Sequence, residues 1–262
     1  MPQPYTRSSK RNLGQNSVAR ILPCKKLDIA DPIKWLALGW QDLTRAPRIS
    51  LFFGVFFVIA PWSIVYLVSL TGWYLVIFPA LIGFMLIGPF LAAGLYDVSR
   101  EFSKGRHPQL LHCVKAINRN AINEWAFGFL LMVIMVFWLK LASIIHTVYP
   151  PYLNENLHNL MPFLLVGTIV GISFTTLVFC ISVFTQPILM ARQVDLATAV
   201  LTSMNTVWQN KLPMFIWACT ICMSVGIGFV TGFIGFMLLM PLIGYASWHG
   251  YRDALENVAD LA

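Results

Sequence analysis

Cysteine and histidine are the side chains in this sequence that could bind a metal or carry redox chemistry. Cys219 and Cys222 form a Cys-x-x-Cys pair, whose thiols would lie close together on one face of a helix. No further cysteine, histidine or carboxylate accompanies them in that apolar run, so we interpret the pair as apolar packing. Only His146 and His249 touch an apolar run, each at its end, which argues against an embedded haem or copper site. We therefore expect no catalytic, cofactor-binding or metal-binding residues.

A repeated spacing places a polar residue eight positions after a proline. The three pairs are Pro89 with Asp97, Pro187 with Asp195, and Pro241 with His249. The stretches 83–100 and 235–252 match in register, and both end in arginine. A proline inside a helix removes a backbone hydrogen bond and kinks the helix. The pattern therefore predicts three kinked helix ends, each leading from a membrane helix into the following surface segment, and we call them proline joints. Two alternatives stay open. Broken helices could line a transport site, or a lipid headgroup could be the substrate of Asp97, Arg100, Asp195 and His249.

The apolar composition places the chain in a membrane. It has 58% hydrophobic residues, 11% charged residues and a mean hydropathy of +0.70, which is too little polar surface for a water-soluble globule. A helix needs roughly 20 apolar residues to cross a bilayer. Dividing the uncharged stretches by that length predicts an all-α integral membrane protein with six transmembrane helices arranged as three hairpins. The expected spans are residues 49–70, 73–96, 121–148, 161–190, 212–230 and 232–249.

A short amphipathic helix is expected on the cytoplasmic surface before each hairpin. The starting signals are Asp31 as cap with Pro32 in the first turn, then Pro108, then Asp195. The expected apolar faces are Ile33, Leu36, Ala37, Trp40 and Leu43 in the first helix, and Ala197, Val200, Leu201, Met204, Val207 and Trp208 in the third. The chain is thus expected to comprise a flexible basic segment (1–30), one membrane domain (31–250) and an amphipathic cytoplasmic stub (251–262).

Basic residues indicate the orientation. Of the 18 Lys and Arg residues, 17 fall on one side of the predicted spans, which the positive-inside rule makes cytoplasmic. Both termini are therefore expected inside. The net charge of +7 reflects this topology and a rim that binds anionic lipid headgroups, and no nucleic-acid partner is expected. The exception is Lys140 in the third span, which could extend to the outer headgroups or line an ion pathway.

The fourth predicted span is the most polar. Its polar residues are Thr168, Ser173, Thr175, Thr176, Ser182, Thr185 and Gln186. Small and hydroxylated residues let helices approach closely, which predicts a central position in the bundle. Alternatively, Thr175, Thr176 and Gln186 could line a polar path. No span carries an aspartate or glutamate at mid-depth, which argues against a proton-coupled pump.

Residues 35–54, WLALGWQDLTRAPRISLFFG, resemble the opening signature of a family of uncharacterised bacterial inner-membrane proteins. This family is a domain of unknown function, and some members are automatically labelled cytochrome c oxidase subunit I-like. The preceding VARI (18–21) and LAAGLYDVSREFSKG (91–105) fit it too, and the resemblance covers about residues 18 to 255. It implies a polytopic protein of the bacterial inner membrane and supplies no known activity. The deep histidines that would ligate haem and copper are absent from this sequence.

Two functions follow from these observations. The first is a protein without catalytic chemistry that acts as an accessory subunit, scaffold or assembly partner of other inner-membrane proteins, for example beside a respiratory complex. The alternative is a small-solute transporter or channel, with the fourth span and the proline joints along its route. Neither function requires a cofactor.

Overall fold

The computed structural model describes residues 21–73, 76–116, 121–148 and 157–256. Within these ranges every regular element is helical, which confirms the expected all-α class. The elements are α1 (Asp31–Arg45), α2 (Pro47–Leu70), α3 (Ile77–Ser103), α4 (Leu110–Ala116), α5 (Ala121–Val148), α6 (Leu157–Ser182), α7 (Thr185–Ala191), α8 (Leu196–Gln209), α9 (Lys211–Val230), α10 (Phe236–Tyr251) and a short π-helix (Arg252–Glu256).

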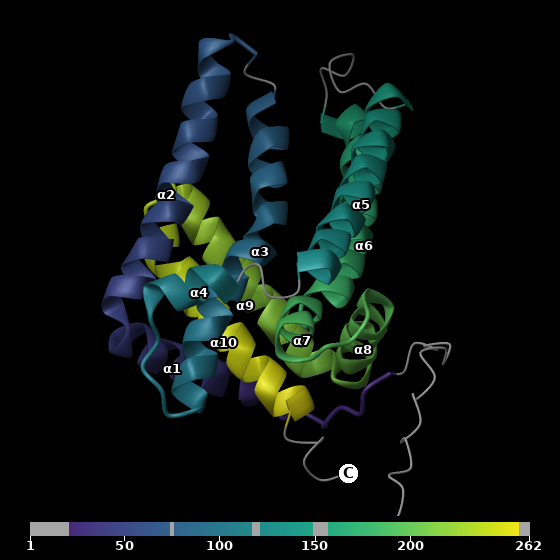
Figure 1. Ribbon diagram of the computed structural model, residues 1–262. Helices are drawn as coiled ribbons and strands as arrows, with labels where there is room; N and C mark the ends of the chain where they lie inside the picture. Colours follow the sequence, from purple (N-terminus) through teal and green to yellow (C-terminus); the bar gives the residue numbers. More distant parts are fainter. Residues whose placement is uncertain (1–20, 74–75, 117–120, 149–156, 257–262) are drawn as a thin grey trace, which may run out of the picture.

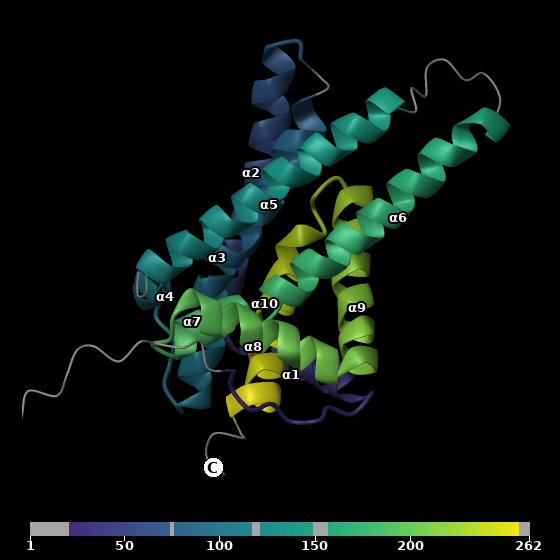
Figure 2. The same ribbon diagram turned by 90° about the vertical axis from the view of Figure 1, so that its right-hand side faces the viewer.

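Three pairs of antiparallel helices extend from one end layer (Figure 1). The pairs are α2 with α3, α5 with α6, and α9 with α10, and the layer around their lower ends contains α1, α4, α7 and α8. Viewed from the side, α5 and α6 are inclined relative to α2 and α9 (Figure 2). The turn between α9 and α10 includes Gly232 at φ 60°, a left-handed conformation that glycine adopts without strain. The sequence predicts a turn at this position.

Within the part of the chain that the structure describes, four helical stretches are long and apolar enough to cross a membrane. They are Pro47–Leu70, Ile122–Val148, Met161–Ala191 and Lys211–Val230, which correspond to the first, third, fourth and fifth predicted spans. The second and sixth predicted spans correspond to α3 and α10, which are not among the four. α10 has 16 residues and is about 24 Å long, shorter than the roughly 30 Å of hydrocarbon in a bilayer. A multi-pass membrane protein is therefore supported, whereas six spans in three hairpins are not confirmed.

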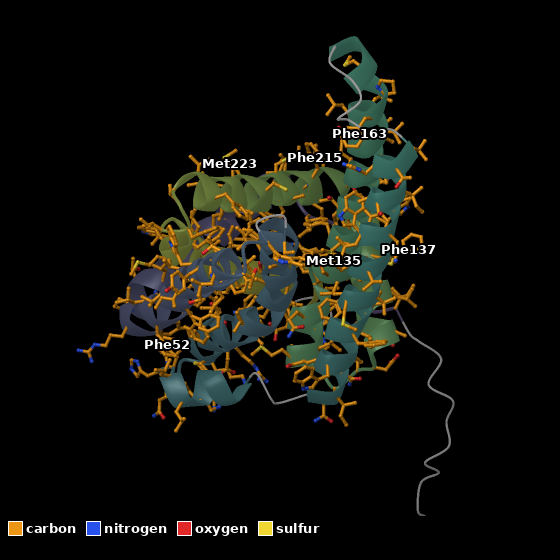
Figure 3. The ribbon with its side chains drawn as sticks, turned by 90° about the horizontal axis from the view of Figure 1, so that it is seen from above. Phe52, Met135, Phe137, Phe163, Phe215 and Met223 are labelled. Carbon is orange, nitrogen blue, oxygen red and sulfur yellow. The ribbon has the colours of Figure 1, made fainter. Side chains whose placement is uncertain are left out.

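Large apolar side chains cover the outside of the helices that extend from the layer. Phe52 on α2, Phe137 on α5, and Phe215 and Met223 on α9 point outward in Figure 3. Their exposed fractions lie between 49% and 66%. Such a surface is stable in lipid and would be costly in water.

The buried face of α8 is polar, the reverse of a helix on a soluble protein. Its buried residues are Thr198, Ala199, Thr202, Ser203 and Thr206. Leu201, Met204 and Trp208, from the predicted apolar face, are exposed instead. This polarity suits a helix that turns its apolar side toward a membrane and its hydroxyl groups toward the protein.

Polar side chains of α8 and its C-terminal flank hold the segment that precedes α1. The backbone N–H of Leu22 donates to Thr202 Oγ1 at 3.1 Å, and that of Leu27 donates to Asn210 Oδ1 at 2.7 Å. These contacts order residues 22–27, part of the segment 1–30 for which the sequence predicts flexibility. Residues 1–20 of that segment lie outside the described residues.

The fourth predicted span is interrupted between Ser182 and Thr185, where α6 ends and α7 begins. Pro187 accounts for the break, because proline has no N–H and its ring collides with the carbonyl four residues earlier, that of Val183. Ser203 of α8 forms hydrogen bonds with two backbone groups at the break. Its hydroxyl donates to the Cys180 carbonyl at 2.8 Å and accepts the N–H of Phe184 at 3.2 Å.

α1 packs against α10 through Trp35, Gly39 and Asp42, which are buried. A Cβ added at Gly39 would lie 2.9 Å from the backbone nitrogen of Ala246, so only glycine permits this close approach. On the opposite side of α1, Ile33 is 66% exposed. α1 therefore presents one face to the protein and directs its predicted apolar face outward.

The first turn of α1 differs from the predicted cap. Ala30 is the N-cap residue, and Asp31 is the first helical residue. The Asp31 carboxylate accepts the backbone N–H of Asp28 at 2.7 Å and pairs with Lys34 Nζ at 2.8 Å. The aspartate therefore stabilises the turn before the helix rather than the N–H groups inside it.

Replacing Ser203 with alanine should destabilise the fold. The change leaves the buried N–H of Phe184 and the carbonyl of Cys180 without their partner, at a cost of roughly 1–3 kcal/mol per group. Thermal unfolding of the full chain in detergent measures this loss. The matched control is Ser173→Ala, because Ser173 is exposed and bonds only to the Ile169 carbonyl of its own helix. Equal losses in both variants would contradict the role of Ser203.

Candidate functional sites

Asp97 belongs to a buried polar cluster between α3 and α4. Asp97 is fully buried, and its Oδ2 lies 2.7 Å from Nδ1 of His112 on α4. Glu101, one turn further along α3, is also buried, and its Oε2 lies 3.1 Å from Nε of Arg106. Potential ligand atoms of Asp97, Glu101 and His112 all lie within 4.8 Å of one another. The cluster ties the end of α3 to the helix that follows it.

The same cluster contains the donor types that bind divalent cations. Two carboxylates and an imidazole suit Zn²⁺ or Mn²⁺. However, Asp97 contacts His112 directly, and Glu101 is paired with Arg106, so these groups satisfy one another. We therefore interpret the cluster as a structural joint. Glu101 and His112 are not among the residues that the sequence predicts for a site, because their proximity to Asp97 depends on the loop that folds α4 back onto α3.

Cys113 lies beside this cluster and is fully buried. Burial raises the pKa of its thiol to about 12, and the negative charge of Asp97 and a hydrogen bond with it act in the same direction. A thiol with this pKa stays protonated at physiological pH. It is therefore unsuited to act as a nucleophile or a metal ligand.

His249 joins α10 to α1. Its Nε2 lies 2.8 Å from Oδ2 of Asp42, and the two side chains are 13% and 4% exposed. Here the histidine is on α10 and the aspartate is on α1 of the end layer. In the other pair the aspartate, Asp97, is on α3 and the histidine, His112, is on α4 of the end layer. The first and third proline joints thus use the same pair of residue types with their positions exchanged.

Asp195 is the N-cap of α8, as the sequence predicts. Its carboxylate accepts the backbone N–H of Thr198 at 3.2 Å and the hydroxyl of the same residue at 2.6 Å. The hydroxyl bond is the main cause that lowers the pKa of Asp195. The role of this residue in the described structure is to stabilise the start of a helix.

The three residues that follow the prolines do not converge on one site. Asp97, Asp195 and His249 contact α4, α8 and α1 respectively. Of the four residues considered for lipid chemistry, only Arg100 and Asp195 line a common pocket. α10 continues through the buried Pro241, and α3 continues through Pro89, whose side chain lies outside the described residues. Among the three prolines, only Pro187 follows a helix break.

Among the described residues, the buried side chains whose polar atoms have no hydrogen-bond partner are Ser99, Glu124, Gln186, Trp217 and Trp248. Gln186 on α7 and Glu124 on α5 are each 1% exposed. Gln186 therefore does not line an open polar path with Thr175 and Thr176, which are exposed on α6. Lys140 is exposed on α5.

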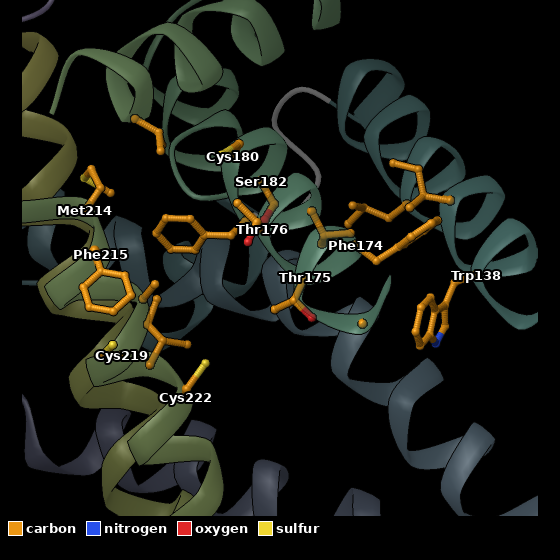
Figure 4. Close-up of a pocket in the computed structure, with 18 of the residues that line it drawn as sticks. Trp138, Phe174, Thr175, Thr176, Cys180, Ser182, Met214, Phe215, Cys219 and Cys222 are labelled. Carbon is orange, nitrogen blue, oxygen red and sulfur yellow. The ribbon is translucent and has the colours of Figure 1, made fainter. Parts of the chain in front are cut away.

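Thr175 and Thr176 border a groove of about 800 Å³ whose walls are α6 and α9, with side chains of α5 beside them (Figure 4). Cys219 and Cys222 line the α9 side, so the Cys-x-x-Cys pair faces the groove. The polar members of the lining are Thr175, Thr176, Ser182 and Lys211, and most of the other residues are apolar. The groove therefore suits an apolar occupant better than an ion or a polar solute.

Residues with small side chains stand four positions apart on both walls of this groove. Gly171 and Thr175 form one such pair on α6, and Ala218 and Cys222 form the other on α9. In membranes this spacing lets the backbones of two helices approach closely. From the sequence, the small residues of the fourth span are expected to contact other helices of this chain.

The pair formed by Asp42 and His249 should show strong coupling in a double-mutant cycle. Replacing either residue with leucine leaves the other buried and unpaired, whereas the double variant removes both polar groups. We expect the double variant to be more stable than the sum of the single losses predicts, by roughly 1–3 kcal/mol. Thermal unfolding of the four proteins in detergent gives the coupling. Additive losses would contradict a direct pair.

Cys113 should resist alkylation in the folded protein. With a pKa of about 12, its thiolate fraction at pH 8 is about one in ten thousand. In a variant whose other cysteines are alanine, iodoacetamide should label Cys113 only after denaturation. The control is Gln109→Cys in the cysteine-free chain, which is exposed nearby and should react in the folded state. Equal reaction rates at both positions would contradict the buried, protonated thiol.

Comparison with known proteins supports the membrane assignment. Residues 77–191, from the start of α3 to the end of α7, match the model of a family described as "Predicted integral membrane protein (DUF2189)". No curated protein and no solved structure matched the chain. The family match confirms the resemblance to uncharacterised integral membrane proteins. The chain is thus similar, over residues 77–191, to an integral membrane protein family of unknown function.

Proposed function

We propose that this chain is an accessory or assembly subunit that binds another integral membrane protein in the bacterial inner membrane. The observation that carries the proposal is the groove between α6 and α9. Its two walls carry the pairs Gly171/Thr175 and Ala218/Cys222, a pattern used for close helix packing, and no helix of the described chain fills it. The proposed occupant is a transmembrane helix of the partner protein.

The exposure of the second helical pair supports this function. Only 11% of the best apolar window of Ile122–Val148 and 6% of that of Met161–Ala191 are buried, against 22% for Pro47–Leu70 and 28% for Lys211–Val230. α5 and α6 thus receive less packing from their own chain than α2 and α9 do. Exposed Thr175, Thr176 and Ser173 on α6 also suit a helix partner better than lipid tails, which offer no hydrogen-bonding groups.

The proposal includes the topology. We infer that the three helical pairs cross the membrane as three hairpins, with α10 as a short sixth span. The inward-facing polar groups of α8 and the outward-facing apolar residues of α1 support a cytoplasmic interface location for the end layer. The distribution of basic residues supports a cytoplasmic location for both termini. Anionic lipid headgroups are expected to bind along this basic rim.

Transport of a small solute is less well supported by the geometry. A polar route would need Gln186 beside Thr175 and Thr176, yet Gln186 is buried in α7 and is not part of the groove lining. The lining is mostly apolar. These features favour a helix or another apolar occupant.

Photo-crosslinking in living bacterial membranes tests the proposed interface. A photoreactive phenylalanine analogue at Thr175 should form an adduct with one protein of defined mass, because this position faces the groove. The matched control is the same analogue at Ile172, which is 63% exposed on α6 but does not line the groove. Ile172 should yield mainly lipid adducts.

Two outcomes would contradict the proposal. Lipid adducts alone at both positions would show that the groove faces bulk lipid. An adduct of twice the chain's own mass at Thr175 would show self-association instead of an accessory role.

A further inference from the structure

A second pocket lies where the ends of three helices meet, away from the groove. Its volume is about 690 Å³, within the range of ligand sites in proteins. Arg100 near the end of α3 and Asn123 in the first turn of α5 contribute side chains, and the chain after α7 contributes Arg192 and Asp195. In contrast to the groove, this pocket is lined mainly by polar groups.

Arg192 is held in place by neutral oxygens. Its Nε donates to the Tyr251 hydroxyl at 3.3 Å, and its Nη2 donates to the Leu255 carbonyl at 3.0 Å. Tyr251 and Leu255 are both buried, so these bonds fix the guanidinium without neutralising its charge. A positioned cation of this kind is suited to bind an anion.

The charge of Arg100 acts in the same region. Burial raises the pKa of Tyr251, and the negative charge of Glu256 adds to this rise. The hydrogen bond from Arg192 and the positive charges of Arg192 and Arg100 oppose it. Both guanidinium groups are therefore close enough to influence the same phenol. Asp195 is the acidic residue of the lining, and its carboxylate is engaged by Thr198. The lining residues thus include two arginines and one aspartate, a formal net charge of +1.

We propose that the pocket formed by Arg100, Asn123 and Arg192 binds a phosphate group, either of an anionic phospholipid or of a small phosphate compound. Guanidinium groups bind phosphate through paired hydrogen bonds, which makes arginine the preferred residue for this anion. The pocket lies at the ends of α3 and α5. In the proposed topology these ends are at the cytoplasmic headgroup level, where basic pockets between helices bind lipid headgroups. The lipid source therefore rests on the proposed function, whereas the phosphate chemistry does not.

Binding by the purified full chain in neutral detergent tests this site. The lipid probe is phosphatidylglycerol, followed by native mass spectrometry, and diacylglycerol with the same acyl chains is the phosphate-free control. The second probe is inorganic phosphate, followed by the thermal shift relative to chloride at equal ionic strength. Lipid-dependent binding identifies a headgroup site, and a specific shift with inorganic phosphate identifies a site for free phosphate compounds.

The variants separate this pocket from general attraction to a basic surface. Arg100→Gln and Arg192→Gln should each weaken binding by about tenfold, the effect of losing one charged hydrogen bond. Arg192→Lys should restore part of the affinity. Arg45→Gln, an equal change of charge on exposed α1 outside the pocket, should bind like the unmodified chain. Asp195→Asn keeps a cap oxygen for α8 and should strengthen binding, because it removes the acidic charge.

Each contrary result is interpretable. No binding of either probe, or an equal loss in Arg45→Gln and the two pocket variants, would overturn the site. Weaker binding by Asp195→Asn would do the same. If Arg192→Gln does not fold, Arg100→Gln and Asp195→Asn still test whether the pocket binds phosphate. The melting temperatures of these two variants without ligand show whether they are folded. Inorganic phosphate binding without lipid binding would preserve the site while removing the support it gives to the proposed topology.

Discussion

The structure depends on one constraint: the end layer must satisfy its polar groups internally while it keeps apolar side chains on the outside. α8 shows this most clearly, because its hydroxyl groups face inward and Leu201 and Trp208 face outward. Because the hydroxyl of Ser203 faces inward, it can accept the N–H of Phe184 and donate to the carbonyl of Cys180 at the break before α7. Backbone N–H and C=O groups that lack helical hydrogen bonds are stable in a nonpolar environment only where such partners exist. The break at Pro187 and the polar face of α8 therefore require each other.

The same constraint explains why the repeated spacing does not create a repeated site. Each polar residue that follows a proline contacts an end-layer helix, but its partner is a different type of side chain in each case. Asp97 contacts His112, Asp195 contacts Thr198, and His249 contacts Asp42. The first and third joints are buried pairs, whereas the second is a helix cap. A shared sequence pattern thus specifies where helices join the layer and leaves the local chemistry to the partner.

Periodicity and composition predicted the helical class, the positions of α1, α4 and α8, and the turns after α2 and α9, because each depends on local sequence. The break within the fourth span was predicted only as a kink, since its replacement hydrogen bonds come from Ser203, which is distant in sequence. Likewise, nothing local indicates that Gly39 meets Ala246 or that His249 meets Asp42. The two arginines of the polar pocket are far apart in the sequence, Arg100 near the end of α3 and Arg192 directly after α7, so their proximity comes from the tertiary fold.

The groove between α6 and α9 connects this architecture to function. The inclination of α5 and α6 leaves the faces with Thr175 and Cys222 without a covering helix of the described chain (Figures 2 and 4). In the proposed assembly, a partner helix covers these faces in the native membrane. Electron cryomicroscopy of the protein extracted with its surrounding native membrane in polymer nanodiscs tests this directly. We expect continuous helical density from another protein in the groove, and density for lipid chains alone would contradict the proposed assembly.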